Sequence, residues 1–228
     1  MQTRESRGTV LPKNASAPPG VMRRHPKRIW RLEGLLFGGL VRVEITKELD
    51  PGDDILEIPW AHPARPDLSY IDLKAHPEEI DRLQECRNYL ALADFLRQAN
   101  SVASPFRTAK CDAWTTTDLA EDEQLDFKLP FKVGSYVDLL FDDPDLTSQL
   151  EAHLEVGKRL GEHLGELRLQ AQMEICLRRC LFHPEERWGY YVTLFVHAYG
   201  ATPQEAEEEW NRAMDAGGDA LAGVGRVL

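Results

Sequence analysis

The chain has 228 residues, 43% of them hydrophobic, and a formal net charge of −11 at pH 7. It contains no apolar run long enough to span a membrane and no signal-peptide pattern at its start, which predicts a cytoplasmic protein without a membrane partner. The four cysteines, at positions 86, 111, 176 and 180, show no disulfide spacing and are expected to stay reduced.

The charge is unevenly distributed along the chain. Residues 1–29 contain seven Arg or Lys residues and one acidic residue, a net of +6, which leaves −17 for residues 30–228. The first segment is rich in Pro, Ser and Gly and has no periodic apolar pattern, so it is predicted to be a disordered basic arm. The arm can bind phosphates or an acidic protein neighbour, or remain a solvated tail, whereas the acidic body repels nucleic acid. Its basic cluster consists of Arg23, Arg24, Lys27 and Arg28.

The first folded region is predicted to begin with a hairpin and a helix. Alternation over 41–46, followed by the turn residues Asp50–Asp53 and the strand-like 55–58, predicts a β-hairpin. The Pro-rich stretch 59–67 reads as a loop. Pro77 then begins a helix expected to end near Asn100.

Two more strands are expected before the chain reaches its C-terminal part. Residues 106–115 predict a strand and 116–124 an acidic loop. The alternation over 125–133 predicts another strand, which Pro130 would confine to an edge or a bulge. Gly134-Ser135 is then expected to form a two-residue hairpin turn.

The C-terminal part shows the strongest periodicity. A strand over 136–141 leads to a helix that begins at Asp143-Pro144 and carries a leucine stripe as far as Leu167. Gly157, Gly161 and Gly165 form a second row on this helix, which indicates close packing, most simply against the sheet, with a surface groove as the alternative.

A strand pair and a helix are expected to follow. Alternation over 167–178 and 188–198 predicts an antiparallel hairpin connected by 183–186, although a helix is possible for the first of these segments. Thr202-Pro203-Gln204-Glu205 is a capping box, and Gly217-Gly218 is expected to end the helix that it begins.

These elements predict an α+β fold. Residues 134–228 are expected to form a ferredoxin-like β-α-β-β-α-β unit, with a mixed β-α-β-β region at 30–133 and the basic arm at 1–29. The two β-α-β-β regions allow a tandem duplication, although their sequences do not establish one.

Few residues have a spacing that indicates chemistry. The spacing Cys176-x3-Cys180-x2-His183 resembles a metal site, but two cysteines four residues apart on a strand lie about 13 Å apart, too far for one zinc ion. Asp142, Asp143 and Asp145 allow Mg²⁺ binding, although a helix cap is the simpler interpretation. No catalytic motif is recognised, so no catalytic residue, metal ligand or cofactor is predicted, and an enzyme is less expected than a binding protein.

The C-terminus shows a local glycine pattern. Gly217-x5-Gly223-x-Gly225 followed by Arg226 resembles the glycine-rich loop of the repeat-associated (RAMP) proteins of CRISPR systems. The resemblance implies ferredoxin-like domains and CRISPR RNA binding, in some members with RNA cleavage. It would place Gly217, Gly223, Gly225 and Arg226 in a phosphate-binding loop beside the basic arm.

Aromatic residues suggest a second way to bind RNA. Ferredoxin-like RNA-binding domains stack bases on aromatics of their two central strands. Tyr136 and Tyr190 fall in strands of that kind, and Trp188 lies nearby, although core or interface roles are more common for such residues.

The sequence therefore favours a non-catalytic binding or assembly subunit, with a nucleoprotein complex as the expected context. The basic arm would bind RNA, other nucleic acid or a neighbouring protein subunit. The alternatives are a RAMP-like endoribonuclease that processes CRISPR RNA, and a viral or secretion-type structural subunit whose arm embraces a neighbour.

Overall fold

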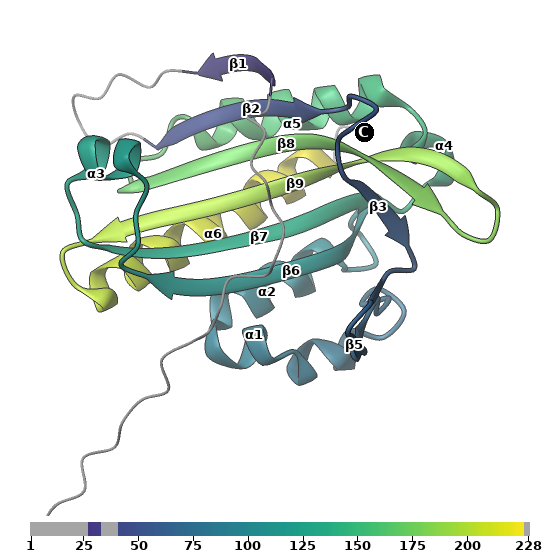
Figure 1. The fold of residues 1–228 in the computed structure, drawn as a ribbon, viewed down its shortest axis with the longest axis horizontal. Coiled ribbons are helices and arrows are strands. Elements are labelled where there is room, and N and C mark those ends of the chain that lie inside the picture. The colour runs from purple at the N-terminus through teal and green to yellow at the C-terminus, as the bar shows by residue number, and fades with distance from the viewer. Residues whose placement is uncertain (1–26, 33–40, 226–228) are drawn as a thin grey trace, which may run out of the picture.

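A computed structural model describes residues 27–32 and 41–225 of the chain. Its centre is a seven-stranded mixed sheet with the order β1-β2-β8-β9-β7-β6, and β3 also pairs with β8 (Figure 1). The main strands are β1 (Lys27–Leu32), β2 (Arg42–Glu48), β3 (Ile55–Ile58), β6 (Phe106–Thr116), β7 (Phe131–Phe141), β8 (Ala171–Phe182) and β9 (Arg187–Gly200).

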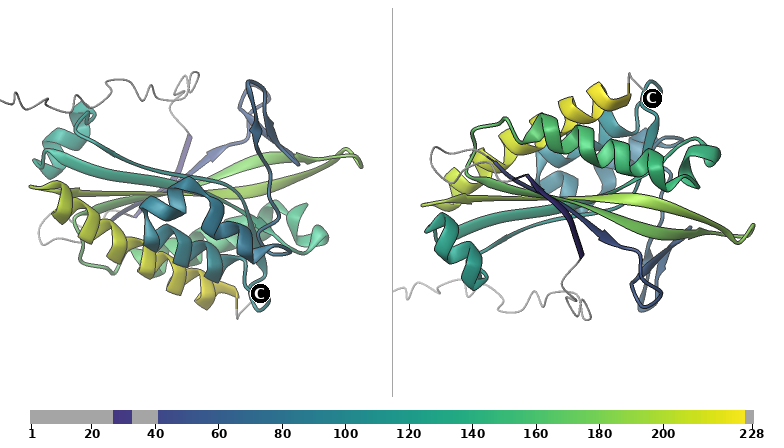
Figure 2. Two further views of the ribbon diagram at one scale, coloured as in Figure 1. Left: turned by 90° about the horizontal axis from the view of Figure 1, so that it is seen from below. Right: turned by 90° about the horizontal axis from the view of Figure 1, so that it is seen from above.

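Helices cover one face of this sheet. Figure 2 shows α2, α5 and α6 on that face, while α3 and the small β4–β5 hairpin project from the other. The helical segments are η1 (Pro77–Arg82), α1 (Gln84–Asn88), α2 (Leu90–Ala99), α3 (Glu121–Phe127), α4 (Pro144–Thr147), α5 (Leu150–Leu164) and α6 (Pro203–Gly225). The hairpin strands are β4 (Ala61–His62) and β5 (Arg65–Ser69).

The covered face is the main hydrophobic core. Inward residues of the strands, such as Val137, Ile175 and Leu194, are at most 1% exposed and pack against Leu160 of α5 and Trp210 of α6. A second, smaller cluster lies between β3 and the far ends of β7, β8 and β9. Within the part of the chain that the structure describes, no helix is long and apolar enough to cross a membrane.

The predicted α+β class is confirmed, and so is the hairpin of 167–178 with 188–198. Strands β8 and β9 pair antiparallel along their whole length, and His183–Glu186 connects them. Their inward positions alternate with polar outward ones, which fixes the register. The caps are also as predicted: Asp143 Oδ1 accepts a hydrogen bond from the Asp145 N–H, and Thr202 Oγ1 accepts one from the Glu205 N–H.

The row of glycines on α5 meets the sheet at Gly157. A Cβ atom there would lie 3.5 Å from both Ile175 and Leu177, an ordinary packing distance. The predicted contact with the sheet is therefore correct at this position.

The hairpin predicted for 41–46 and 55–58 is wrong. The turn after β2 is present, since the Asp53 N–H donates to the Asp50 carbonyl. However, β2 and β3 both pair in parallel with β8, one beyond the other along the same edge. The alternation that both segments show therefore reflects one shared partner strand.

The turn predicted at Gly134-Ser135 is also wrong, because both residues are buried in the middle of β7. A Cβ atom at Gly134 would lie 2.8 Å from the Trp114 ring, so the glycine makes room for that indole. The domain boundary predicted between residues 133 and 134 falls inside this strand, and a single sheet includes strands from both sides of it.

Helix predictions were wrong at four places. The helix expected from Asp143-Pro144 to Leu167 is divided into α4 and α5 and ends at Leu164. The helix expected from Pro77 to Asn100 is divided into η1, α1 and α2. The acidic loop and the start of the next strand form helix α3. Helix α6 does not end at Gly217-Gly218 but continues to Gly225.

The elements predicted at the two ends of the chain are only partly described. Lys27 and Arg28, predicted to belong to the arm, have backbones that pair with Lys47 and Thr46 as part of β1. Arg23, Arg24 and Arg226 lie outside the described residues. The final strand expected after Gly217-Gly218 does not form in the described residues, because helix α6 continues to Gly225.

Candidate binding face

The two faces of the sheet differ in composition. The face opposite α2, α5 and α6, called the polar face below, carries charged, hydroxyl and aromatic side chains. Helix α3 lies at one end of it and the β3–β5 segment at the other (Figures 1 and 2). The residues that define the polar face are Glu44, Asp112, Trp114, Tyr136, Asp138, Glu174, Arg178, Thr193, Phe195 and His197.

Strand register aligns five of these residues in one row across the sheet. Glu44 of β2 lies opposite Glu174 of β8, Glu174 opposite Phe195 of β9, Phe195 opposite Tyr136 of β7, and Tyr136 opposite Asp112 of β6. Directly opposed residues point to the same face. This central row therefore has two aromatic rings in its middle and carboxylates at both ends.

The aromatic pair of the central row is partly accessible. The ring centroids of Tyr136 and Phe195 are 6.0 Å apart, with the planes inclined by 48°, and both residues are half-buried. In the neighbouring row, the Trp114 ring lies over Gly134 and makes an edge contact with His197 at 6.1 Å. These rings present an extended aromatic surface on strands β6, β7 and β9.

Two carboxylates of the central row lack a cationic partner. Asp112 and Glu174 are half-buried, and among the described residues neither forms an ion pair. Burial raises the pKa of both groups, and the charge of nearby Glu85 raises that of Asp112 further. The Thr46 hydroxyl donates to Glu174 at 2.8 Å, and the Asp112 carboxylate accepts from the Ala113 N–H. Both groups are thus hydrogen-bonded acids without an ion pair among the described residues, and the charge of Arg178 offsets only part of the rise in the pKa of Glu174.

A third carboxylate, Asp138, lies deeper in the next row. It is 4% exposed, accepts a 2.7 Å hydrogen bond from the Thr193 hydroxyl, and forms no ion pair within the described segments. Burial raises its pKa to about 6. Three acidic groups, on β6, β7 and β8, therefore all have raised pKa values, and β9 lies between the last two of these strands.

An arginine already occupies part of this face. The Arg178 guanidinium lies over the Phe195 ring at 5.4 Å, donates to Glu48 at 2.7 Å and donates to the Thr193 hydroxyl at 3.3 Å. A planar guanidinium can stack on an aromatic ring while it pairs with a carboxylate at its edge. Arg178 thus shows how a guanidinium group can bind to this face, on an aromatic ring and beside a carboxylate.

Helix α3 is fixed to the end of the polar face by a buried ion pair. Lys132 Nζ lies 2.7 and 3.0 Å from the two Glu123 oxygens, and the Tyr199 hydroxyl donates to Glu123 at 2.8 Å. Burial alone would raise the pKa of Glu123, but Lys132 and the hydrogen bonds from Ala120 and Tyr199 hold it below its ordinary value. Phe127 stacks on Tyr199 at 3.8 Å. This cluster is structural, because its charges compensate each other.

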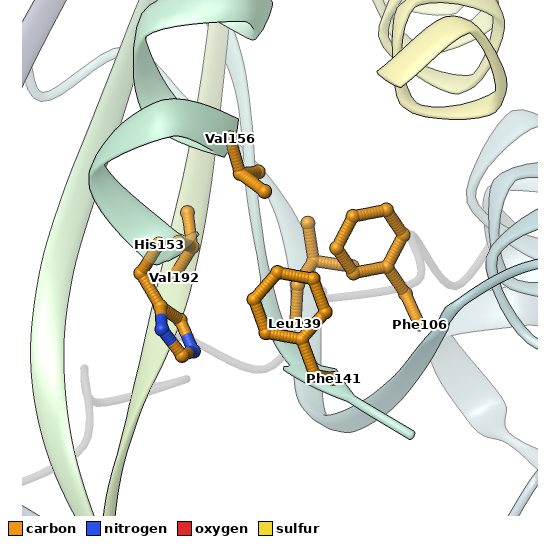
Figure 3. Close-up of a pocket in the computed structure, with 6 residues that line it drawn as sticks. All are labelled: Phe106, Leu139, Phe141, His153, Val156 and Val192. Atoms are coloured by element: carbon orange, nitrogen blue, oxygen red, sulfur yellow. The ribbon is translucent and has the colours of Figure 1, made fainter. Parts of the chain in front are cut away.

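A second candidate, an apolar space beneath α5, does not suit a ligand. Figure 3 shows His153 and Val156 of the helix facing Phe106, Leu139, Phe141 and Val192 of the sheet. The space is too small to admit a water molecule. His153 Nδ1 lies 2.7 Å from the Gln149 carbonyl, and burial lowers the pKa of the imidazole. His153 is therefore a neutral core residue.

The structure separates the residues that the sequence grouped as a metal site. Cys176 and Cys180 lie on strand β8, as the alternation predicted, and both are buried. Burial raises the pKa of these thiols to about 11 and about 12. His183 lies in the turn, with Nε2 at 3.5 Å from a Glu57 oxygen. No cluster of three metal-ligating side chains occurs in the described ranges 27–32 and 41–225.

The predicted glycine-rich loop is not present as a loop. Gly217 and Gly223 lie within helix α6, and a Cβ atom at Gly217 would lie 3.6 Å from the Phe95 ring. Gly225 ends the helix beside Pro105. Backbone N–H groups inside a helix are already hydrogen-bonded and cannot bind phosphate. The observed packing gives Gly217 and Gly225 a structural role, whereas a Cβ atom at Gly223 would meet nothing within 4 Å.

The sequence identified only part of the polar face. Tyr136 was considered as an aromatic of a central strand, and it lies in the central row. Tyr190 points to the helix-covered side, where its ring is 5.9 Å from His153, and Trp188 is 53% exposed near the β8–β9 turn. Asp112, Glu174 and Phe195 were missed, because only the long-range register brings them together.

Comparisons with known proteins identify no relative of this chain. No family model matches it, no curated protein matches its sequence, and no solved structure matches its fold. The function must therefore be inferred from the geometry of the polar face.

Proposed function

We propose that the protein is a non-catalytic binding and assembly subunit whose polar face binds a cationic, arginine-containing segment of a protein partner. The observation that carries this proposal is the central row, in which Asp112 and Glu174 flank two aromatic rings and have no ion pair in the described part of the chain. Aromatic faces next to carboxylates attract guanidinium and ammonium groups.

The raised pKa values support the same ligand chemistry. A half-buried carboxylate without a counterion costs free energy, and a bound cation removes this cost. Arg178 shows the geometry that such a cation would adopt, since it stacks on Phe195 and pairs with Glu48. A partner arginine placed over Tyr136 would repeat this arrangement beside Asp112.

A second candidate, binding of single-stranded RNA, is favoured by the positions of Tyr136 and Phe195. Strands β7, β8 and β9 and helix α5 follow a ferredoxin-like order, β8-β9-β7, and β6 takes the place beside β7 that a final strand would fill. We infer from this a permuted ferredoxin-like unit, whose two central strands carry these aromatics. The carboxylates of the central row repel phosphates, so RNA is the second choice.

A pair of charge-matched variants tests the proposal. The full chain is titrated with a fluorescent hexa-arginine peptide, and the variant Asp112→Asn/Glu174→Gln is compared with Glu207→Gln/Asp219→Asn. Both variants remove two negative charges, but Glu207 and Asp219 are exposed residues of α6 on the opposite side of the sheet. A labelled single-stranded RNA is titrated in parallel across a salt series.

We expect the central-row variant to lose about tenfold in peptide affinity, because two charge-assisted contacts disappear. The α6 control should change by less than about twofold, the residual effect of net charge. Equal losses of peptide affinity in both variants would show that the peptide responds only to the net charge of the protein, and this would refute the proposal. RNA binding that is stronger than peptide binding, or cleavage of the RNA, would replace it with the nucleic-acid alternative.

A further inference from the structure

We infer that the basic N-terminal segment of the chain, residues 1–26, binds the central row of the same molecule and so competes with the partner for it. This inference rests on the proposed function and names a second, internal ligand for the same face. It assigns the segment a regulatory role in place of direct binding to nucleic acid. Three observations support it: where the segment joins the sheet, how far it can reach, and how the charges are distributed.

The segment joins the sheet next to the polar face. Residue 27 begins β1, which pairs antiparallel with β2, and Lys27 lies opposite Lys47 near the end of that strand. Strand β2 is the direct neighbour of β8, which carries Glu174. The segment is therefore attached two strands away from one carboxylate of the central row.

The segment is long enough to reach the whole row. With strands about 4.8 Å apart and about 3.3 Å between residues, Lys27 lies about 14 Å from Glu174 along the sheet. Arg23 is four residues from Lys27, which allows a backbone separation of about 13 Å, and its side chain extends further. The remaining residues span more than the about 15 Å between Glu174 and Asp112.

The charges are complementary. Residues 1–26 contain five Arg or Lys residues and one Glu, a net charge of +4, which leaves −15 for residues 27–228. Among the described residues, Asp112, Asp138 and Glu174 of this face form no ion pair and keep raised pKa values, although the charge of Arg178 acts on Asp138 and Glu174. Arg23 and Arg24 supply the guanidinium groups that the aromatic pair and its flanking acids suit.

Attachment in the same chain favours the intramolecular complex. A short connection gives an effective concentration in the millimolar range, far above that of a free partner in dilute solution. A weak interaction is then sufficient to occupy the face for most of the time. A partner must displace the segment, so its apparent affinity is reduced by the fraction of molecules with a free face.

The experiment uses the full chain and two variants that remove the same charge. Arg23→Gln/Arg24→Gln removes the pair next to β1, whereas Arg4→Gln/Arg7→Gln removes two arginines near the start of the segment. Affinity for the hexa-arginine peptide is measured for both and for the unchanged chain. Light scattering records the oligomeric state over a hundredfold range of protein concentration.

We expect Arg23→Gln/Arg24→Gln to raise peptide affinity about fivefold, as expected if the face is free in about a fifth of the unchanged molecules. Arg4→Gln/Arg7→Gln should raise it by less than about twofold.

Peptide binding that depends on Asp112 and Glu174 but does not respond to Arg23 and Arg24 would overturn this inference and leave the proposed function intact. An effect that appears only at concentrations where dimers form would assign the segment to a second copy and would also overturn it. Absence of any row-dependent peptide binding would overturn both proposals.

Discussion

The same strands present two very different surfaces on the two faces of the sheet. On the helix-covered face, Val137, Ile175 and Leu194 are buried under α5 and α6 and have no polar groups to satisfy. On the polar face, the residues directly next to these in the same strands are Asp138, Glu174 and Phe195. Alternation along a strand makes this division possible, since successive side chains point to opposite faces.

The two faces have opposite effects on the stability of the fold. Burial of apolar side chains drives folding, whereas a buried carboxylate without a counterion opposes it. The polar face keeps three such acids, Asp112 on β6, Asp138 on β7 and Glu174 on β8, at a cost in stability. We therefore expect substitutions on the helix-covered face to reduce stability, and neutralisation of the acids on the polar face to reduce peptide binding without reducing stability.

The largest effect is expected at the centre of the helix-covered face. Trp210→Ala should reduce the free energy of unfolding by about 4 kcal/mol, because a fully buried indole is removed and a cavity remains. The Trp210 N–H also donates a 3.0 Å hydrogen bond to the Ser135 hydroxyl. In the variant, this hydroxyl loses its indole donor. Urea unfolding measures the loss, and a change below about 1 kcal/mol would contradict the assigned core.

The next largest effect is expected at the structural end of the polar face. Lys132→Ala should cost about 3 kcal/mol at pH 7, because it leaves the Glu123 carboxylate buried without its counterion. Glu123 has a lowered pKa in the folded state, so the stability from this pair is present above the unfolded pKa. It is lost as pH falls through the folded pKa. Urea titrations at several pH values should show the variant's deficit shrinking in acid, and a deficit independent of pH would contradict the assignment.

Replacing Asp138 should increase the free energy of unfolding, whereas the two preceding substitutions decrease it. Its folded pKa is about 6 and its ordinary value is 3.8, so the folded state binds more protons between these values and loses stability as pH rises through them. Asp138→Asn keeps the acceptor for Thr193 and should therefore increase stability at pH 7.5 by about 2 kcal/mol. The gain should decline towards pH 4. A variant that is less stable than the unchanged chain at pH 7.5 would show that the acid is compensated.

The smallest change in stability is expected in the central row itself. Asp112→Asn/Glu174→Gln should alter the free energy of unfolding by less than about 1 kcal/mol, with a slight gain, because both acids have raised pKa values and no counterion. The same variant is expected to lose peptide affinity. A large destabilisation would mean that the row is structural and would remove the contrast between the two faces.

Part of this fold was predictable from local sequence signals. The β8–β9 hairpin was found because both segments alternate strictly, and two helix starts were found because Asp143 caps α4 and Thr202 caps α6. Each of these signals is contained within a few residues. Gly134 was misread because its requirement is tertiary: it makes room for the Trp114 ring from the neighbouring strand.

The binding face was largely not predictable from the sequence. Asp112, Tyr136 and Glu174 are distant along the chain, and only the pairing of β6, β7, β9 and β8 aligns them. A shift of one residue in any of these pairings would move a side chain to the other face. The raised pKa values are also a consequence of burial that the sequence alone does not show.

The central claim is that the acids of the central row contact a bound cation. Carbodiimide labelling of carboxyl groups in the full chain, read by mass spectrometry with and without saturating hexa-arginine peptide, tests this contact directly. The account predicts that labelling of Asp112 and Glu174 falls several-fold when the peptide binds, while labelling of Glu207 and Asp219 on α6 does not change. Equal protection of both pairs, or protection of neither while the peptide is bound, would contradict it.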